Sequence, residues 1–185
     1  MSNHINQDPV IVSHLLRSNY DFPNNDQLPL LIYQSAIRFT EKDNAADIIQ
    51  EIFKRNKWVN SWRDGIFDYH HYHSTAHEVL GVYSGNCTAQ FGGPQGVIIK
   101  LSREDVIIIP AGVAHKNLNS TNDFSCVGAY PVGQHYDMNY GKKHERPEAD
   151  NNIRKLPLPP TDPVYGLNGK LFTFWRFHNS LHAVE

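Results

Sequence analysis

Four of the eleven histidines of the chain fall within eight residues, and this cluster is the strongest chemical signal in the sequence. The four are His70, His71, His73 and His77. Alternate side chains of a β-strand share a face, so we expect His71 and His73 to point the same way and His70 to point away. Two neutral imidazoles on one face can converge on one ion, and imidazoles together with a carboxylate suit Fe(II), Mn(II), Ni(II) and Zn(II). The spacing therefore predicts a divalent-metal site.

The residues that follow the cluster offer a further ligand. His77 supplies an imidazole and Glu78 a carboxylate, and because neighbours on a strand face opposite sides, only one of them can face the metal. The stretch is not the HExxH motif of zinc proteases, because Gly81 stands where the second histidine would be. Tyr69 shares the face of the histidine pair and could line a pocket, and Tyr69 and His77 are the candidates for a catalytic acid or base.

Length and composition set limits on the class of protein. A chain of 185 residues has the size of one domain. With 17 Lys and Arg against 19 Asp and Glu, it lacks the positive field that nucleic acid or an anionic membrane surface would require. It also has neither an apolar run of roughly 18 residues nor a secretory signal, so we expect a cytoplasmic protein. Cys87 and Cys126 lack CxxC spacing and are expected to be reduced, buried thiols.

The hydrophobic pattern indicates an all-β core with one helix. Short β-branched and aromatic runs alternate with turn residues, as in an antiparallel sandwich or barrel, at 66–73, 77–83, 96–101, 105–110 and 124–130. Residues 28–37 have the pattern of a further strand. Residues 44–56 have apolar side chains at helical spacing and predict one amphipathic helix that covers the core. Charged and proline-rich residues 142–163 predict an extended tail, and residues 170–177 a closing edge strand.

Two motifs make the chemical reading more specific. The first cupin motif is matched at every fixed position by Gly65, His71, His73, Glu78 and Gly85. Five residues separate Gly65 from His71, four separate His73 from Glu78, and six separate Glu78 from Gly85. The second cupin motif matches at Pro110, Gly112, His115 and Asn119, and departs at Glu104, where the cupin pattern has glycine. This departure concerns the geometry of a turn, because glycine adopts conformations that other residues avoid. The chain therefore resembles the cupins, and the segments DYHHYHSTAHEVLGVYSG and IIPAGVAHKN resemble the bacterial YjlB-type cupins.

The resemblance implies a fold and a ligand set. The fold would be a cupin-type double-stranded β-helix, or jelly-roll barrel, forming one structural domain. Residues 1–62 would be an N-terminal strand and helix packed on the barrel, 63–140 the barrel core, and 141–185 the proline-rich tail with its edge strand. The metal would be held by His71, His73, Glu78 and His115, with Fe(II) favoured over Mn, Ni or Zn.

Two classes of function fit such a site. The first is a metal-dependent enzyme acting on a small polar molecule, with an Fe(II) dioxygenase favoured and a decarboxylase or isomerase as variants. The second is a metal-stabilised module that binds or senses a small molecule without turnover, since one fold can host many functions. A barrel whose histidines hold no metal is a third possibility. Asn117 could hydrogen-bond a substrate, and exposed strand edges favour a homodimer.

Overall fold

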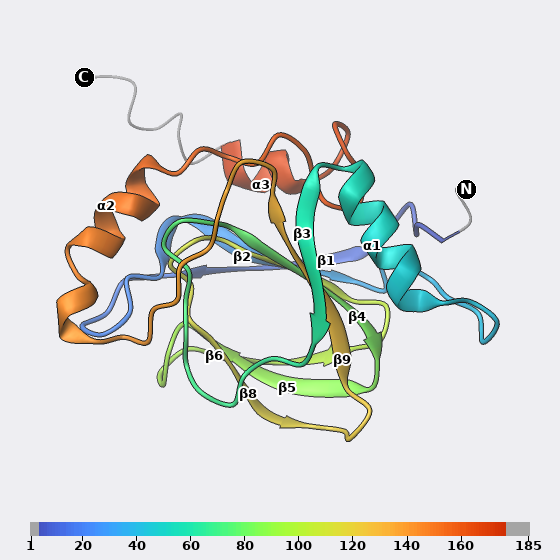
Figure 1. Ribbon diagram of the computed structural model, residues 1–185, viewed down its shortest axis with the longest axis horizontal. Coiled ribbons are helices and arrows are strands. Elements are labelled where there is room, and N and C mark those ends of the chain that lie inside the picture. The colour runs from blue at the N-terminus through green and yellow to red at the C-terminus, as the bar shows by residue number, and fades with distance from the viewer. Residues whose placement is uncertain (1–3, 177–185) are drawn as a thin grey trace.

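Two antiparallel sheets face each other in the computed structural model, which describes residues 4–176 (Figure 1). The larger sheet has the strand order β1-β2-β7-β4-β9-β3 and the smaller has the order β6-β5-β8. The strands are β1 (Val10–Leu16), β2 (Asn25–Gln34), β3 (Trp58–Asp64), β4 (Glu78–Ser84), β5 (Asn86–Phe91), β6 (Val97–Ser102), β7 (Val106–Ile109), β8 (His115–Ser120) and β9 (Ser125–Pro131). The predicted all-β jelly-roll architecture is confirmed, and the predicted strand at 28–37 corresponds to β2.

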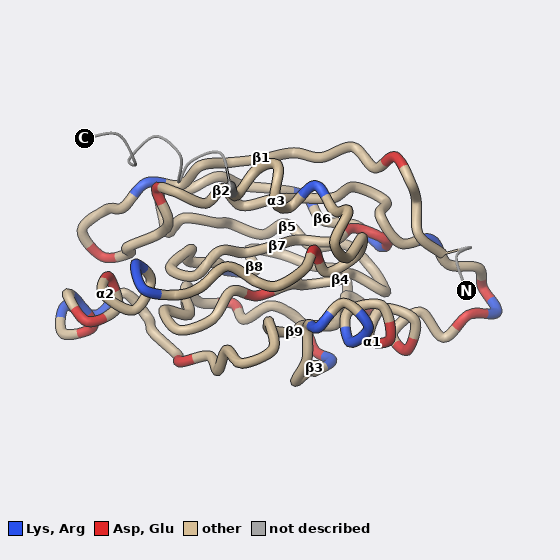
Figure 2. The backbone as a smooth tube through the Cα atoms, turned by 90° about the horizontal axis from the view of Figure 1, so that it is seen from above, with Lys and Arg blue, Asp and Glu red and all other residues tan. Residues whose placement is uncertain are grey.

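The central strands of the six-stranded sheet are buried on both faces, whereas much of the edge strands β1 and β3 is exposed. Along β7, Ile107 and Ile109 pack into the interior between the two sheets, whereas Val106 and Ile108 pack against the outer layer of helices. This alternation follows from the two-residue period of a strand. The interior also contains Cys87 and Cys126, which are free and buried as expected. Charged residues lie mostly in helices and loops, and the central strands carry few of them (Figure 2).

The predicted amphipathic helix is present as α1 (Ala45–Arg55) on the outer face of the large sheet (Figure 1). The side chain of Asn44 accepts a hydrogen bond from the main-chain N–H of Asp47, which satisfies one of the free donors at the helix start. Ile49 and Phe53 are fully buried one turn apart. They approach the sheet closely at Gly81, where an added Cβ would lie 2.8 Å from Ile49 Cγ2. Among residues 4–176, no helix is sufficiently long and apolar to cross a membrane.

The segment that carries the histidine pair is not the regular strand predicted at 66–73. It pairs through isolated bridges, with His71 opposite His115 and Tyr72 opposite Asn139. The main-chain N–H of His71 donates to His115 O at 3.2 Å, and that of Tyr72 donates to Asn139 O at 2.9 Å. Because successive residues bond to different neighbours, no ladder develops along the segment. His71 and His73 are nevertheless on the same side, because the backbone between them stays locally extended at the two bridges.

The predicted extended tail at 142–163 is interrupted by helical turns. They are η1 (Lys143–Glu145) and α2 (Glu148–Lys155). Acidic residues occupy the first turn of α2 and basic residues its last, an order that favours the helix dipole. Arg146 and Asp150 form an ion pair at 2.6 Å beside its start. The acidic first turn and basic last turn therefore stabilise a helix in a segment whose proline content predicted an extended tail.

The predicted edge strand at 170–177 is wrong, because residues Leu171–Arg176 form the helix α3. Leu171 and Trp175 are one turn apart and fully buried against the outer face of the large sheet. The indole N–H of Trp175 donates to Pro29 O at 2.9 Å. Burial of these two anchors outweighs the strand preference of the aromatic residues around them. Residue 177 lies outside the described residues.

Glu104 occupies the turn position where the cupin pattern has glycine, and it adopts a φ of +81°. Its carbonyl accepts from the Ile37 N–H at 3.2 Å, and its Oε1 accepts from the Phe39 N–H at 3.1 Å. Two hydrogen bonds therefore hold a backbone conformation that costs about 1–2 kcal/mol for a residue with a Cβ.

We expect Glu104→Ala to be less stable than Glu104→Gly by about 1 kcal/mol in urea unfolding. Both variants lose the side-chain bond to Phe39, but alanine keeps the backbone strain whereas glycine relieves it. At an unstrained site alanine would be the more stable variant by roughly 0.4–1 kcal/mol, because glycine gives the unfolded chain more conformational entropy. An alanine variant as stable as the glycine variant would contradict the account of this turn.

Candidate metal centre

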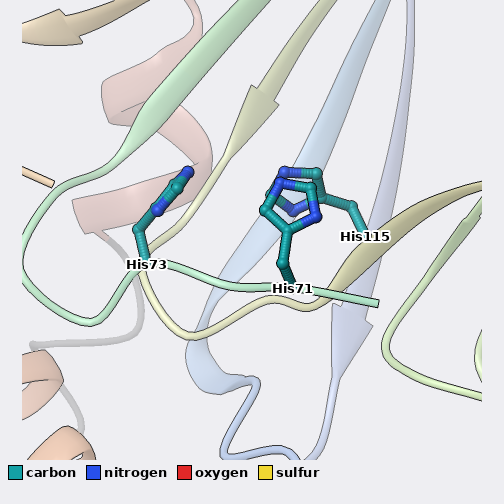
Figure 3. Close-up of side chains that lie close together, drawn as sticks. All are labelled: His71, His73 and His115. Atoms are coloured by element: carbon teal, nitrogen blue, oxygen red, sulfur yellow. The ribbon is translucent and has the colours of Figure 1, made fainter. Parts of the chain in front are cut away.

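Three buried imidazoles converge at one end of the space between the two sheets. They belong to His71 and His73, on the bridged segment, and to His115, at the start of β8 (Figure 3). Their ligand nitrogens all lie within 4.8 Å of one another. The rings of His71 and His115 are nearest, with centroids 4.1 Å apart, because the bridge between these residues places them opposite each other. A cluster of this size suits one metal ion.

The second nitrogen of each ring fixes which atom is free for a ligand. Each Nδ1 lies against a main-chain carbonyl: His71 against Tyr69 O at 3.3 Å, His73 against Asp137 O at 2.5 Å, and His115 against Val113 O at 3.1 Å. A carbonyl oxygen only accepts, so Nδ1 carries the hydrogen in all three rings. In the neutral form of each ring, which is the form that binds a metal, the lone pair therefore lies on Nε2. Metal-binding histidines in general have this arrangement.

The carboxylate of Glu78 lies beside the imidazoles at the beginning of β4. Its Oε2 is 3.3 Å from His115 Nε2 and 3.5 Å from His73 Nε2. Glu78 points inward because it shares the face of Leu80, which lies in the interior between the sheets. Its Oε2 is buried and has no hydrogen-bond partner. A buried anionic oxygen without a partner is costly and requires a nearby cation.

Electrostatics within the cluster favour an ionised Glu78. Burial would raise the pKa of Glu78, but the neighbouring His73 and His115 hold it well below its usual range. Burial would lower the pKa of His73, but the Glu78 carboxylate raises it above its usual value. Burial, together with the charges of His115 and His73, lowers the pKa of His71 to about 3. The site is therefore an anion surrounded by imidazoles, of which His71 stays neutral.

His77 immediately precedes β4 and points to the side opposite Glu78, outside the site. Its ring packs against Trp175, with centroids 4.9 Å apart, and its Nδ1 accepts from the Ala111 N–H at 3.0 Å. Burial lowers the pKa of His77 to about 3. Of the two neighbours that compete for the metal, Glu78 faces the histidines and His77 faces α3. The structure gives His77 no access to a substrate as an acid or base.

Tyr69 lies on the side of His71, as predicted, but it does not line the cavity. Its ring is 42% exposed and stacks on Phe67, with centroids 4.9 Å apart, so that its hydroxyl is not part of the cavity beside the histidines. It contacts the site through its carbonyl, which lies against His71 Nδ1, and through its ring, which meets the His71 ring edge to face with centroids 5.9 Å apart. Asn117 is engaged in the wall of the small sheet, where it accepts from the Cys87 thiol. Asn119 is exposed near the end of β8.

A cavity of about 340 Å³ adjoins the imidazoles, and most of its walls are apolar or aromatic. Its lining consists of Trp62, Arg63, Asp64, Gly65, Ile66, Phe67, His71, His73, Glu78, Leu80, His115, Tyr130, Tyr136 and Met138. The sequence analysis did not identify Tyr130. Alternation along β9 places it inward, because it lies four residues after Cys126, which pairs with Val82 and packs in the interior. Tyr136 lies in a loop and gave no signal.

Residues 134–139 hold the ligand segment from outside. Asp137 is central, because its carboxylate accepts from the N–H and hydroxyl of Ser74 and from the N–H of Thr75, while its carbonyl meets His73 Nδ1. The Gln134 side chain accepts from the His77 N–H at 3.0 Å. The Thr75 hydroxyl donates to His135 O at 2.7 Å. These bonds fix the position of His73, and no motif in the sequence pointed to them.

Two facing antiparallel sheets, an HxH segment, an inward glutamate on the next strand and a third histidine after a PxG turn define a cupin. Over 153 residues the chain is 42% identical to the uncharacterized protein YjlB of Bacillus subtilis (strain 168). The aligned region covers 83% of this chain and 89% of YjlB. The chain belongs to the YjlB family. It matches no protein-family model.

Solved structures show weaker likeness. Acireductone dioxygenase from Bacillus anthracis, determined with a cadmium ion in its active centre, has a TM-score of 0.40 and 15% identity, covering 70% of this chain and 83% of the other. The epimerase RmlC from Legionella pneumophila has a TM-score of 0.38 and 17% identity, covering 69% and 74%. At such values, function has to be inferred from this chain's own residues.

Removal of the Asp137 carboxylate should destabilise the protein strongly. We expect Asp137→Ala to lower the free energy of unfolding by about 2–4 kcal/mol, because three donors next to His73 lose a charged acceptor. Asp137→Asn should lose less, since its amide oxygen can still accept. Urea unfolding of the two variants measures the difference. An alanine variant within about 0.5 kcal/mol of the wild type would show that Asp137 does not hold this segment.

Proposed function

We propose that this protein is a metal-dependent enzyme acting on a small molecule, with one divalent transition metal held by His71, His73, Glu78 and His115. The observation that carries the proposal is the buried, unpartnered Oε2 of Glu78 beside two imidazole Nε2 atoms. A divalent cation placed among these atoms would satisfy the carboxylate and the free lone pairs together. The donor set therefore fits a metal.

Among the metals that this donor set suits, we propose Fe(II) as the first choice. Three imidazoles and one carboxylate suit Fe(II), and also Mn(II), Ni(II) and Zn(II). Bound Fe(II) would supply Lewis-acid and oxygen chemistry to a substrate at its open coordination positions, as in a dioxygenase. With another metal, decarboxylation or isomerisation would take precedence. The four side chains would serve to fix the ion at the inner end of the cavity.

Tyr130 is the residue of this chain best placed to hold a proton beside the metal. Its hydroxyl accepts from the indole N–H of Trp62 at 2.9 Å. Burial and the Glu78 carboxylate raise the pKa of Tyr130 far above its usual value, so that it remains a neutral phenol. It lines the cavity, whereas Tyr69 and His77 do not. The aromatic walls would also limit the access of water to a bound substrate.

Metal analysis tests the proposal. Protein purified without an affinity tag or chelator should contain close to one equivalent of a transition metal. His115→Ala should lose it, with an affinity at least about a hundredfold weaker, because a ligand is removed. His70→Ala is the matched control, since its ring lies beside Phe22 and outside the cluster, and should keep the metal.

The outcomes separate the possible functions. Retention of metal by His115→Ala, or absence of metal binding in the wild type with added Fe(II), would contradict the proposed site. Metal binding followed by oxygen consumption with a small-molecule substrate would support the dioxygenase. Saturable binding of a molecule that is recovered unchanged would favour the non-catalytic binding module.

A further inference from the structure

Two large aromatic rings stand at the mouth of the cavity beside the buried histidines. Phe67 is 48% exposed and Tyr136 is 50% exposed, although both line the cavity. Apolar side chains that are exposed together around a concavity mark a surface for binding. The two rings come from separate parts of the chain, one before the ligand segment and one from the loop after β9.

The ring of each of these two residues packs edge to face against one histidine of the cluster. Phe67 meets His71 edge to face, with centroids 5.1 Å apart and planes at 73°. Tyr136 meets His73 in the same way, at 5.1 Å and 61°. Tyr136 also stacks on the buried ring of Tyr130, at 4.6 Å and 23°. The aromatic walls therefore have defined positions relative to the metal-binding nitrogens.

Apart from the proposed metal, the described side chains of the cavity offer no free cation to an acidic group on the substrate body. Among the described residues that line it, Arg63 is the one with a permanently positive side chain. Its guanidinium donates to Asp47 and to Gln50 on α1, so its charge is already engaged. Asp64 and Glu78 are anionic. A carboxylate or phosphate on the substrate body would find no partner here, and desolvating it would weaken binding.

The cavity is large enough for one aromatic ring. A cavity of about 150 Å³ is enough for benzene, and this one measures about 340 Å³. It can therefore hold a ring together with a short chelating group that reaches the imidazoles.

We propose that the substrate is a molecule with one flat, uncharged aromatic ring that carries an adjacent pair of metal-binding oxygen atoms. This inference rests on the proposed function, since the oxygen pair binds the metal. The ring packs between the walls formed by Phe67 and by Tyr136 with Tyr130. The sequence analysis expected a small polar molecule as the substrate. The present proposal restricts the polar atoms of that molecule to its chelating group.

Benzohydroxamate and acetohydroxamate test the inference, because they share one chelating group and differ by a phenyl against a methyl group. Both are titrated into the full-length protein loaded with Co(II), whose visible absorption reports ligand binding. We expect benzohydroxamate to bind roughly tenfold more tightly or better, because the phenyl group buries additional apolar area between the walls.

Variants assign the preference to the walls. Tyr136→Ala and Phe67→Ala should each reduce the ratio of the two dissociation constants severalfold while still binding Co(II). Tyr140→Ala, another exposed aromatic outside this cavity, should leave the ratio unchanged. A ratio near one in the wild type, or a ratio unaffected by both wall variants, would overturn the inference. Failure of the wild type to bind Co(II) would instead overturn the proposed metal site.

Discussion

A carboxylate buried beside three imidazoles is the constraint on which the rest of this structure depends. The Oε2 of Glu78 has no hydrogen-bond donor and is shielded from water, so it requires positive charge close by. The imidazoles of His73 and His115 approach it to 3.5 Å and 3.3 Å with their Nε2 atoms. Backbone carbonyls on the far side of each ring keep these atoms available. A dication among them resolves both requirements, and this is the physical basis of the proposed centre.

The position of Glu78 follows from the burial of β4 on both faces of the sheet. Alternation along β4 sends Glu78 and Leu80 into the interior between the sheets and Val79 toward the helices. His77, immediately before the strand, also points toward the helices. The outer layer formed by α1 and α3 therefore matters for the site, because it buries the second face of the strand that carries the carboxylate. The bridge between His71 and His115 ties the two motifs together across the barrel.

Much of this arrangement could be predicted from the sequence, where a periodic pattern or a spaced motif reports it. Examples are the helix α1, the strand β4 and the grouping of the side chains of His71, His73, Glu78 and His115. What escaped prediction depends on long-range contacts. The segment 66–73 pairs with two different neighbours, α3 forms because Leu171 and Trp175 have a sheet to cover, and Asp137 acts through bonds to residues more than 60 positions away. Alternation placed Tyr69 beside His71 correctly, but its position outside the cavity depends on its stacking against Phe67, which no sequence pattern reports.

X-ray absorption fine structure of the protein loaded with one equivalent of Fe(II) tests the central claim most directly. The proposed centre predicts scattering from three imidazole rings and an oxygen ligand in the wild type, and from two rings in His73→Ala. A sulfur ligand, or an imidazole count that does not change in His73→Ala, would contradict it.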